Sequence, residues 1–466
     1  MDDKRVTAEA ILAEIELDVK RMAQKVADAI NNAEAGAIID QSEEQVRDAH
    51  AELRQKTYQK ALGLLDENQQ AFSPRHSHPT IKWKNKGRQK TRYLTVNGRL
   101  DFSRTVYWHE QAGSVVPLDA FLGIDTRKAS LGVCEICCRE SLNNAFVPAS
   151  ANIQRLAQLD ISSSTIRQIV ENEGSVLSRA QHKKQTEPGF TSEDCTDHTL
   201  ITGADGVMVP LVTEPQKQKR RKTQAEKRKK EKRKSTAKAS RPRKGSDGPY
   251  KEFKIVAFYD RDKTHQYVVG TRGDHTVAGR LMRQVGGQLE IANARRKYSV
   301  TDGAEWIRNQ YNIQLPMLDE NILDFYHFRE HVTETSHVLF GEGSDQASTW
   351  KDQMLAVAKN QGSLVMLDHL GRHLEDVKDE TKRLKLENLR DYIGKRIAMT
   401  DYPYFVEKGY DIGSGPTESF CGSLTARLKG SGMRWDTDNA EAVMALASVY
   451  YSNQWEQYWE AKRKAA

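Results

Sequence analysis

The sequence predicts an α/β protein in which a mixed-sheet core, interrupted by an all-helical insertion, follows N-terminal helical and small antiparallel β regions. Three patterns support this fold class. Apolar residues recur every three or four positions over residues 7–66, alternate with polar residues over residues 100–108, and form short runs between residues 199 and 330. These patterns are typical of amphipathic helices, of a half-exposed strand and of buried strands, respectively.

Residues 1–70 are predicted to form a helical hairpin, because Gly36 separates two apolar stripes of helical spacing. Such a hairpin can pack on the rest of the chain or serve as an arm for dimerisation, and both interpretations remain open. The first stripe consists of Ile11, Ile15, Val19, Met22, Val26 and Ile30, and the second of Val46, Ala49, Leu53 and Leu62.

Residues 80–125 are predicted to form a small antiparallel β unit. The dipeptide Asn97-Gly98 predicts a hairpin with a type I′ turn. Because successive side chains of a strand alternate, the strand that follows has one apolar face, made of Leu100, Phe102, Val106 and Trp108.

Residues 126–190 are predicted to be helical, and Ser162-Ser163-Ser164 can cap one helix at its N-terminus. Two helices joined by a polar turn fit a DNA-binding helix-turn-helix and equally well any helical corner, so both interpretations remain open. The residues expected to face the core are Ile153, Leu156 and Ala157 in one helix and Ile166, Ile169 and Val170 in the next.

The remaining chain is divided into the first part of the core (residues 199–330), a helical insertion (331–405) and the C-terminal part of the core (406–466). A final helix is expected from Pro416, because proline favours the first helical position. The order of elements matches a ribonuclease-H-like fold, with three antiparallel strands followed by parallel ones. The apolar runs predict strands over 200–212, 253–259 and 266–270, a helix over 276–293, and strands over 297–303 and 322–327.

Three acids fall on elements that converge at one edge of such a sheet. Asp205 lies within the first core strand, Asp302 at the end of the fourth, and Glu418 on the final helix. Carboxylates suit magnesium, and two such ions about 3.5–4 Å apart can clamp the attacking and leaving oxygens of a phosphodiester. Each acid also has a structural interpretation, because Asp-Gly is typical of turns and an acid in the first turn of a helix favours its dipole.

A basic insert follows the first core strand. Residues 216–244 hold 16 Lys and Arg against 2 Asp and Glu, a local charge of +14, whereas the rest of the chain carries −7. Since the insert has almost no apolar residue, disorder is predicted over residues 216–249. It is either a solvated loop or a segment that binds phosphates without discriminating base sequence. The residues predicted to contact DNA are Lys219, Arg220, Arg221, Lys222, Arg228, Lys229, Lys230, Arg233 and Lys234.

The sequence argues against a membrane-spanning protein and against a secreted one. No window approaches the about 18 consecutive apolar residues of a membrane span, and no apolar region follows the first residues as in a secretory signal. The five cysteines are too few and too clustered for a disulfide framework, which fits a reducing compartment. We therefore expect a cytoplasmic protein without a membrane partner.

Several segments together resemble one known family. They are residues 205–211 (DGVMVPL), 301–307 (TDGAEWI), 323–327 (LDFYH), 413–419 (GSGPTES) and 427–435 (RLKGSGMRW). On these motifs the chain resembles the DDE transposases of bacterial insertion sequences, of the ISKra type and more weakly of the related ISLre type. The resemblance extends from about residue 90 to the end, and the last two motifs are its most specific part.

The resemblance implies phosphodiester hydrolysis at the ends of a mobile element and joining of the 3′ hydroxyls to target DNA. It makes Asp205, Asp302 and Glu418 the catalytic and metal-binding triad, with two Mg²⁺ ions or, alternatively, Mn²⁺. The expected partners are element ends, target DNA and further copies of the chain, in a nucleoid-associated protein. Two alternatives remain open: an inactive DNA-binding remnant of a transposase, and a metal-dependent nuclease without strand transfer.

Three residues outside the basic insert are also expected to contact DNA. They are His327, Arg427 and Arg434. For His327, a structural role beside the acidic edge is an equally valid interpretation.

Zinc is not expected. Proteins of the resembled family often carry a cysteine pair before a Pro-Leu-Asp turn, whereas residues 108–113 have none here. Cys134, Cys137 and Cys138 could share an ion, but the candidate fourth ligands, Cys195 and His198, lie about 60 residues away. The segment is also predicted to be helical, and cysteines in a helix pack as small apolar residues.

Overall fold

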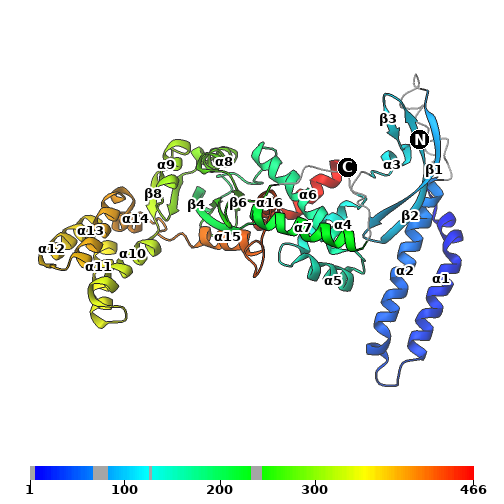
Figure 1. The fold of residues 1–466 in the computed structure, drawn as a ribbon, viewed down its shortest axis with the longest axis horizontal. Coiled ribbons are helices and arrows are strands. Elements are labelled where there is room, and N and C mark those ends of the chain that lie inside the picture. Colours follow the sequence, from blue (N-terminus) through cyan, green and yellow to red (C-terminus); the bar gives the residue numbers. More distant parts are fainter. Residues whose placement is uncertain (1–5, 67–81, 125–127, 232–243, 466) are drawn as a thin grey trace. The chain divides into compact units, whose positions relative to one another are not determined.

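The computed structural model describes residues 6–66, 82–124, 128–231 and 244–465, and it has a mixed α/β fold, as predicted (Figure 1). The chain divides into two compact units. One consists of Met1–Val170 with Trp459–Ala466, and the other of Glu171–Tyr458. The first contains a small antiparallel sheet with strand order β1-β2-β3, and the second a five-stranded mixed sheet.

The predicted helical hairpin is confirmed as α1 (Ala8–Asn31) and α2 (Ile38–Asp66). The apolar stripe of α1 was predicted incorrectly at Val19 and Ile30, which are 36% and 43% exposed. Asp18 is buried in their place, and its carboxylate lies 2.8 Å from the ammonium of Lys60 on α2. The hydrogen bond from Lys60 holds the pKa of Asp18 below its ordinary value. A count of apolar residues alone could not detect this buried ion pair.

The predicted β unit is confirmed, but its turn type is not. Thr95 pairs with Gly98, so Val96 and Asn97 form the turn. A type I′ turn needs positive φ at both turn residues, whereas at this hairpin the positive φ, +114°, belongs to Gly98. The elements are β1 (Lys84–Thr95), β2 (Gly98–His109), β3 (Gly113–Val115) and the short helix α3 (Pro117–Phe121).

The predicted helices after this unit are α4 (Leu131–Glu140), α5 (Phe146–Ala157) and α6 (Ser163–His182). Ser162 caps α6, because its hydroxyl accepts a hydrogen bond from the Thr165 N–H at 3.2 Å. Ile153 and Ile166 are buried as predicted, but Leu156 is 76% exposed. Whether α5 and α6 bind DNA remains a prediction.

The five-stranded sheet has the order β6-β5-β4-β7-β8. β4 pairs antiparallel with β5 and parallel with β7, so the sheet is mixed. The expected fifth strand is shorter than predicted, because Phe325 begins helix α10 instead of continuing the strand. The strands are β4 (Thr199–Pro210), β5 (Tyr250–Tyr259), β6 (Gln266–Thr271), β7 (Arg296–Thr301) and β8 (Glu320–Leu323).

Helices cover both faces of this sheet (Figure 1). The main apolar core lies between one face of the sheet and the helices α8 (His275–Gln288) and α9 (Glu305–Gln314). On the other face, α15 (Gly415–Ala426) packs on Gly203 of β4, and α16 (Thr437–Tyr451) packs on Gly270 of β6. The predicted final helix is therefore α15, and α16 and α17 (Trp455–Ala465) follow it.

The segment between β8 and α15 is helical, as predicted. Its helices are α10 (Phe325–Phe340), α11 (Asp345–Gln361), α12 (Ser363–Asp376), α13 (Glu380–Gly394) and α14 (Tyr402–Glu407). Short 3₁₀ turns lie at Thr196–His198, Ile291–Asn293 and Ile397–Met399.

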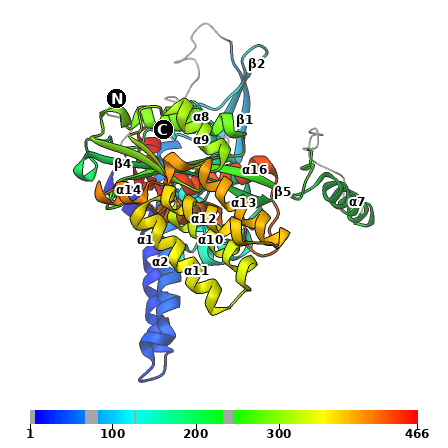
Figure 2. The same ribbon diagram turned by 90° about the vertical axis from the view of Figure 1, so that its left-hand side faces the viewer.

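The basic insert begins as a helix, α7 (Glu214–Lys230), which stands off from the sheet in Figure 2. The predicted disorder is therefore wrong for residues 216–230, and residues 232–243 lie outside the described residues. Thr213 and Gln216 form a capping box at its start, and lysine, arginine, glutamine and glutamate are good helix formers. The absence of an apolar face led us to predict disorder, but these local preferences favour a helix.

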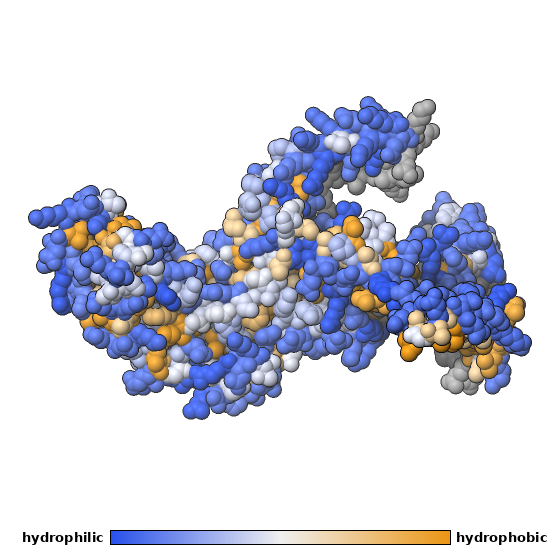
Figure 3. Space-filling view, turned by 90° about the horizontal axis from the view of Figure 1, so that it is seen from below, coloured by the Kyte–Doolittle hydropathy of each residue, from blue (hydrophilic) through white to orange (hydrophobic). Residues whose placement is uncertain are grey.

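The surface visible in Figure 3 is mostly hydrophilic, and apolar side chains occur on it in small groups. Among the residues that the structure describes, no helix combines the length and the apolar character that crossing a bilayer requires.

Candidate active site

Asp302 and Asp324 directly follow the carboxyl ends of β7 and β8, and Asp205 lies within β4, just beyond the part of that strand that pairs with β7. Thr202 of β4 pairs with Ser299 of β7, and Asp205 and Asp302 each lie three residues further along. Thr301 of β7 pairs with Leu323 of β8, so Asp302 and Asp324 are the next residues along. Since residues in register on parallel strands lie side by side, this edge of the sheet gathers Asp205, Asp302 and Asp324.

Glu418 reaches the same region from the first turn of α15. The helix can approach β4 closely because Gly203 has no side chain: a Cβ there would lie 1.9 Å from Oγ1 of Thr417. Gly203 and Asp205 are two residues apart on a strand, so they share a face of the sheet. The close contact of Thr417 with Gly203 therefore positions Glu418 on the face of Asp205.

His327 and Ser414 link Glu418 to Asp324. Nε2 of His327 lies 3.7 Å from Oε1 of Glu418, and its Nδ1 lies 3.1 Å from Oε2 of Glu330. The Ser414 hydroxyl donates to Asp324 and lies 3.3 Å from Oε1 of Glu418. One potential ligand atom from each of Asp324, His327 and Glu418 lies within 4.8 Å of the other two.

The acids interact electrostatically. Burial raises the pKa of Asp302 above its ordinary value and the negative charge of Asp205 adds to the rise, although the Ala304 N–H, His327 and Arg396 act in the opposite direction. The Cys421 thiol on α15 is also buried, which raises its pKa, and a hydrogen bond with Asp205 raises it further. Cys421 and Asp302 thus both sense the charge of Asp205, which ties β4, β7 and α15 into one acidic site.

Arg396 brings positive charge to this site from the end of the helical insertion. Its Nε donates to the carbonyl of Gly303 at 3.1 Å, and its guanidinium lies 4.1 Å from the centre of the Tyr392 ring. Burial lowers the pKa of Arg396, while the charge of Asp302 acts against this decrease. Arg396 therefore connects the helical insertion to the loop that carries Asp302.

The structure brings the predicted Asp205, Asp302, Glu418 and His327 into one region. Asp324, Ser414 and Arg396 lie in the same region, and the motifs and spacing assign them no role. For Asp324 a signal exists, because it lies within the predicted strand 322–327 and within the motif of residues 323–327. Ser414 lies in the motif of residues 413–419, but its contact with Asp324 spans 90 residues and cannot be read from the sequence. No sequence pattern marks Arg396, whose contact with Gly303 spans 93 residues.

The donor set fits a hard divalent cation. Magnesium prefers carboxylate oxygens, which Asp205, Asp302 and Glu418 supply. A cation would offset both the burial of Asp302 and the repulsion from Asp205, which together raise the pKa of Asp302. Asp324 suits a supporting role, because one carboxylate oxygen accepts from the Tyr326 N–H at 2.8 Å and the other from Ser414. The imidazole of His327 is a less typical magnesium ligand.

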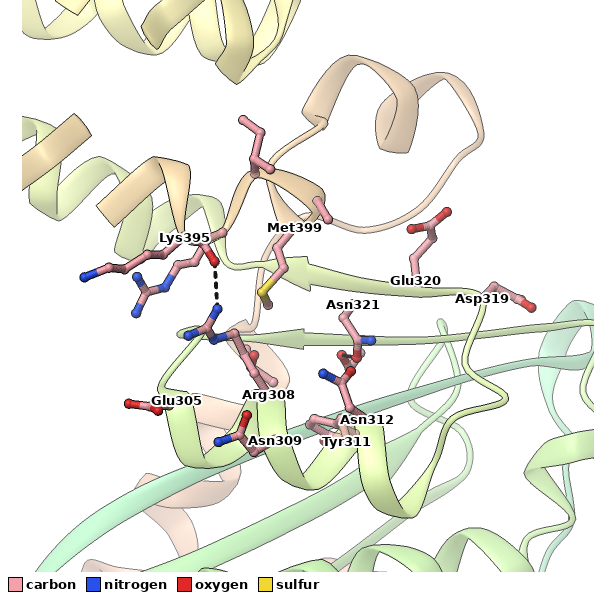
Figure 4. Close-up of a pocket in the computed structure, with 15 residues that line it drawn as sticks. Glu305, Arg308, Asn309, Tyr311, Asn312, Asp319, Glu320, Asn321, Lys395 and Met399 are labelled. Carbon is pink, nitrogen blue, oxygen red and sulfur yellow. Dashed lines mark hydrogen bonds between the residues drawn. The ribbon is translucent and has the colours of Figure 1, made fainter. Parts of the chain in front are cut away.

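The site lies beside a polar cavity of about 430 Å³ rather than within it. Figure 4 shows Arg308 and Asn309 of α9 and Asn321 of β8 around this cavity, and a hydrogen bond of 2.8 Å from Arg308 to the carbonyl of Lys395. None of the three predicted catalytic acids lines it. Among these acids Glu418 is exposed, Asp205 and Asp302 are half-buried and Asp324 is buried, so the site opens to solvent outside the cavity.

The predicted phosphate-binding residues differ in their exposure. On α7, Lys219, Arg220, Lys222, Arg228, Lys229 and Lys230 are exposed and Arg221 is half-buried, whereas Arg233 and Lys234 lie outside the described residues. Arg434 is exposed. Arg427 is only 7% exposed, and its guanidinium lies 4.9 Å from the centre of the Trp435 ring. Its predicted contact with DNA is therefore corrected to a packing role.

We expect purified protein to contain no stoichiometric zinc. Cys134, Cys137 and Cys138 are buried on α4, and burial, together with Cys134, raises the pKa of Cys137 to about 12. Zinc binds the thiolate, which this environment disfavours. Elemental analysis of protein purified without chelators is the measurement. One tightly bound zinc per chain would contradict the expectation and would direct attention to these cysteines.

A comparison with known protein families identifies a family that this chain matches. The profile of the Uncharacterised protein family (UPF0236) matches residues 20–276, more than half of the chain. The matched region includes Asp205 but ends before Asp302 and Glu418. No curated protein matches the chain.

Proposed function

The chain belongs to the uncharacterised protein family UPF0236, and from that starting point we propose that it is a metal-dependent DNA transposase. It would cleave phosphodiester bonds at element ends and join the 3′ hydroxyls to target DNA. The observation that supports this function best is the convergence of Asp205, Asp302 and Glu418 on one edge of the sheet. Each comes from a different element, as the resemblance to DDE transposases implies.

The topology supports the same proposal. The strand order β6-β5-β4-β7-β8, with antiparallel pairs on one side of β4 and parallel pairs on the other, is the order of a ribonuclease-H-like core. A helical segment separates β8 from α15, as in transposases that carry an insertion before the last acid. Fold alone does not imply function, so the proposal depends on the acids.

The residues of the chain have distinct roles in the proposed reaction. Asp205, Asp302 and Glu418 would hold two Mg²⁺ ions, which when bound activate the attacking oxygen and stabilise the leaving oxygen of the phosphodiester. Ser414 and His327 position the Glu418 carboxylate through their contacts with Oε1. Arg396 holds the Gly303 carbonyl and so fixes the loop of Asp302. The exposed cations of α7 would bind the DNA backbone.

Two alternative functions use the same surfaces: a nuclease that cleaves without strand transfer, and an inactive DNA-binding remnant. The test uses full-length protein, Mg²⁺ and labelled DNA that carries the sequences flanking its gene. A transposase yields both cleaved ends and products joined to a second DNA. Cleavage without joined products would favour the nuclease, and binding without cleavage would favour the remnant.

We expect α7 to provide a large share of the salt-dependent affinity for DNA. Lys219, Arg220, Lys222 and Arg228 are exposed, and each phosphate contact adds about 0.9 to the slope of log affinity against log salt. Replacing all four by Gln should flatten this slope by about 3–4, measured with non-specific duplex between 50 and 200 mM salt.

A matched control for α7 neutralises four exposed basic residues of the helical insertion. These are Arg372, Lys378, Arg383 and Arg390. This variant should keep the original slope. An unchanged slope in the α7 variant, or an equal decrease in the control, would show that α7 does not bind phosphates.

A further inference from the structure

The β1–β2 pair of the first unit has an unusual charge pattern. Residues 82–99 contain seven Lys and Arg and no Asp or Glu. Six of the seven alternate with other residues from just before β1 into that strand, namely Lys82, Lys84, Lys86, Arg88, Lys90 and Arg92. All six are exposed. This cluster belongs to a different unit from α7 and from the acidic site.

A β-bulge distributes these cations over both faces of the strand pair. Simple alternation would place all six on one face. However, the register shifts between Asn85 and Arg88, where Gly87 has a φ of +79°, so two residues of β1 lie opposite one of β2. Because of this extra residue, side chains that alternate regularly in the sequence point to one face of the strand pair before the bulge and to the other face after it.

The pairing partners identify the two faces. Lys84 pairs with Trp108, and the ammonium groups of Lys84 and Lys86 lie 5.7 and 5.2 Å from the centre of its ring. Beyond the bulge, Lys90 pairs with Ser103, on the polar face of β2. Arg88 and Arg92 share that face, since they alternate with Lys90. Both faces of the pair therefore present cations.

Protection of an edge strand against association with other strands explains this charge pattern poorly. Lysines on an edge strand do prevent association with other strands, and β1 is an edge strand. A few charges suffice for that purpose, whereas cations repeated about every 6.6 Å repel one another. Arg92 forms an ion pair of 3.0 Å with Asp101 of β2, and residues 82–99 themselves contain no acid, so the segment has a high density of positive charge. A polyanion would compensate it.

We propose that the β1–β2 pair binds duplex DNA by entering the major groove. The major groove admits a two-stranded β-ribbon, and phosphates then lie on both sides of it. Cations on only one face of a ribbon would contact the phosphates of one DNA strand. Cations on both faces can contact the phosphates on both sides of the groove. β1 and β2 are 12 residues each and run side by side in Figure 1, and the short β3 pairs only with residues 107–109 of β2.

The inference rests on DNA being the ligand in the proposed function, but it does not depend on catalysis. The test therefore uses the full-length chain in EDTA with non-specific duplex DNA, so that loss of the acidic site cannot affect the result. Replacing Lys84, Lys86 and Lys90 by Gln should flatten the salt dependence of affinity by about 2–3. Replacing the same three by Arg should leave it unchanged, because the charge is kept.

A charge-matched control in the same unit replaces Lys20, Arg21 and Arg54 by Gln, all exposed on the helical hairpin. This variant should bind DNA like the original chain, and circular dichroism verifies that each variant is folded. Methylation protection of guanine N7, which lies in the major groove, should be lost only in the Gln variant of the ribbon. An unchanged salt slope in that variant, an equal loss in the control, or no N7 protection by the original chain would overturn the proposal.

Discussion

Single replacement of the three converging acids, as Asp205→Asn, Asp302→Asn or Glu418→Gln, is expected to lower the rate of DNA cleavage by at least about 10²–10³-fold. Each change keeps the shape of the side chain but removes one negative charge from a site that is proposed to hold two divalent ions. Folding should persist, because Asp205 and Asp302 repel each other, and neutralising one relieves that repulsion. The measurement is cleavage of DNA that carries the flanking sequences, at saturating Mg²⁺.

The controls for the triad are Asp197→Asn and Glu305→Gln. Both acids are exposed, and they lie next to β4 and at the start of α9 without joining the acidic edge. They should retain cleavage activity. Full activity in any triad variant, or an equal loss in these controls, would refute the assignment of the catalytic acids.

Gly203→Ala is expected to destabilise the protein by about 1–3 kcal/mol and to reduce cleavage as well. The added Cβ would lie 1.9 Å from Oγ1 of Thr417, whose side chain is buried and cannot move away. α15 must therefore shift, and Glu418 shifts with it. The measurements are chemical denaturation for stability and the same cleavage assay for activity.

Gly422→Ala provides the matched control on α15, because a Cβ there meets no atom within 4 Å. This change should be neutral or slightly stabilising, since alanine favours a helix more than glycine does. Combining Gly203→Ala with Thr417→Ala should recover part of the lost stability. If Gly203→Ala alone proved as stable as the original chain, the close contact would not position α15.

The sequence predicted most of the core elements, because buried strands of parallel sheets are continuous apolar runs that end at polar residues. The same reasoning placed Asp205 and Asp302 at a shared edge. It failed where a local pattern competes with a distant contact: Asp18 is polar but buried against Lys60, and Arg427 is charged but buried against Trp435.

Other features depend on backbone details that residue types do not specify. The bulge at Gly87 changes which face of β1 each lysine occupies, although the sequence alternates regularly. The hairpin between β1 and β2 was recognised from Asn97-Gly98, but its register shifts the turn by one residue and changes its type. The role of Ser414 depends on a contact between the N-terminal ends of α10 and α15, which are far apart in the sequence.

The placement of the acids also has a consequence for biosynthesis. Asp205 and Glu418 are separated by more than 200 residues, and the helices of the insertion lie between β8 and α15. During translation, Asp205 is therefore made long before the helix that completes the site. Contacts so distant along the chain form slowly, and larger proteins fold through partly structured intermediates. A nascent chain would thus carry β1, β2 and α7 before the acidic site is complete, so under the proposed function the segments proposed to bind DNA form before the site proposed to cleave it.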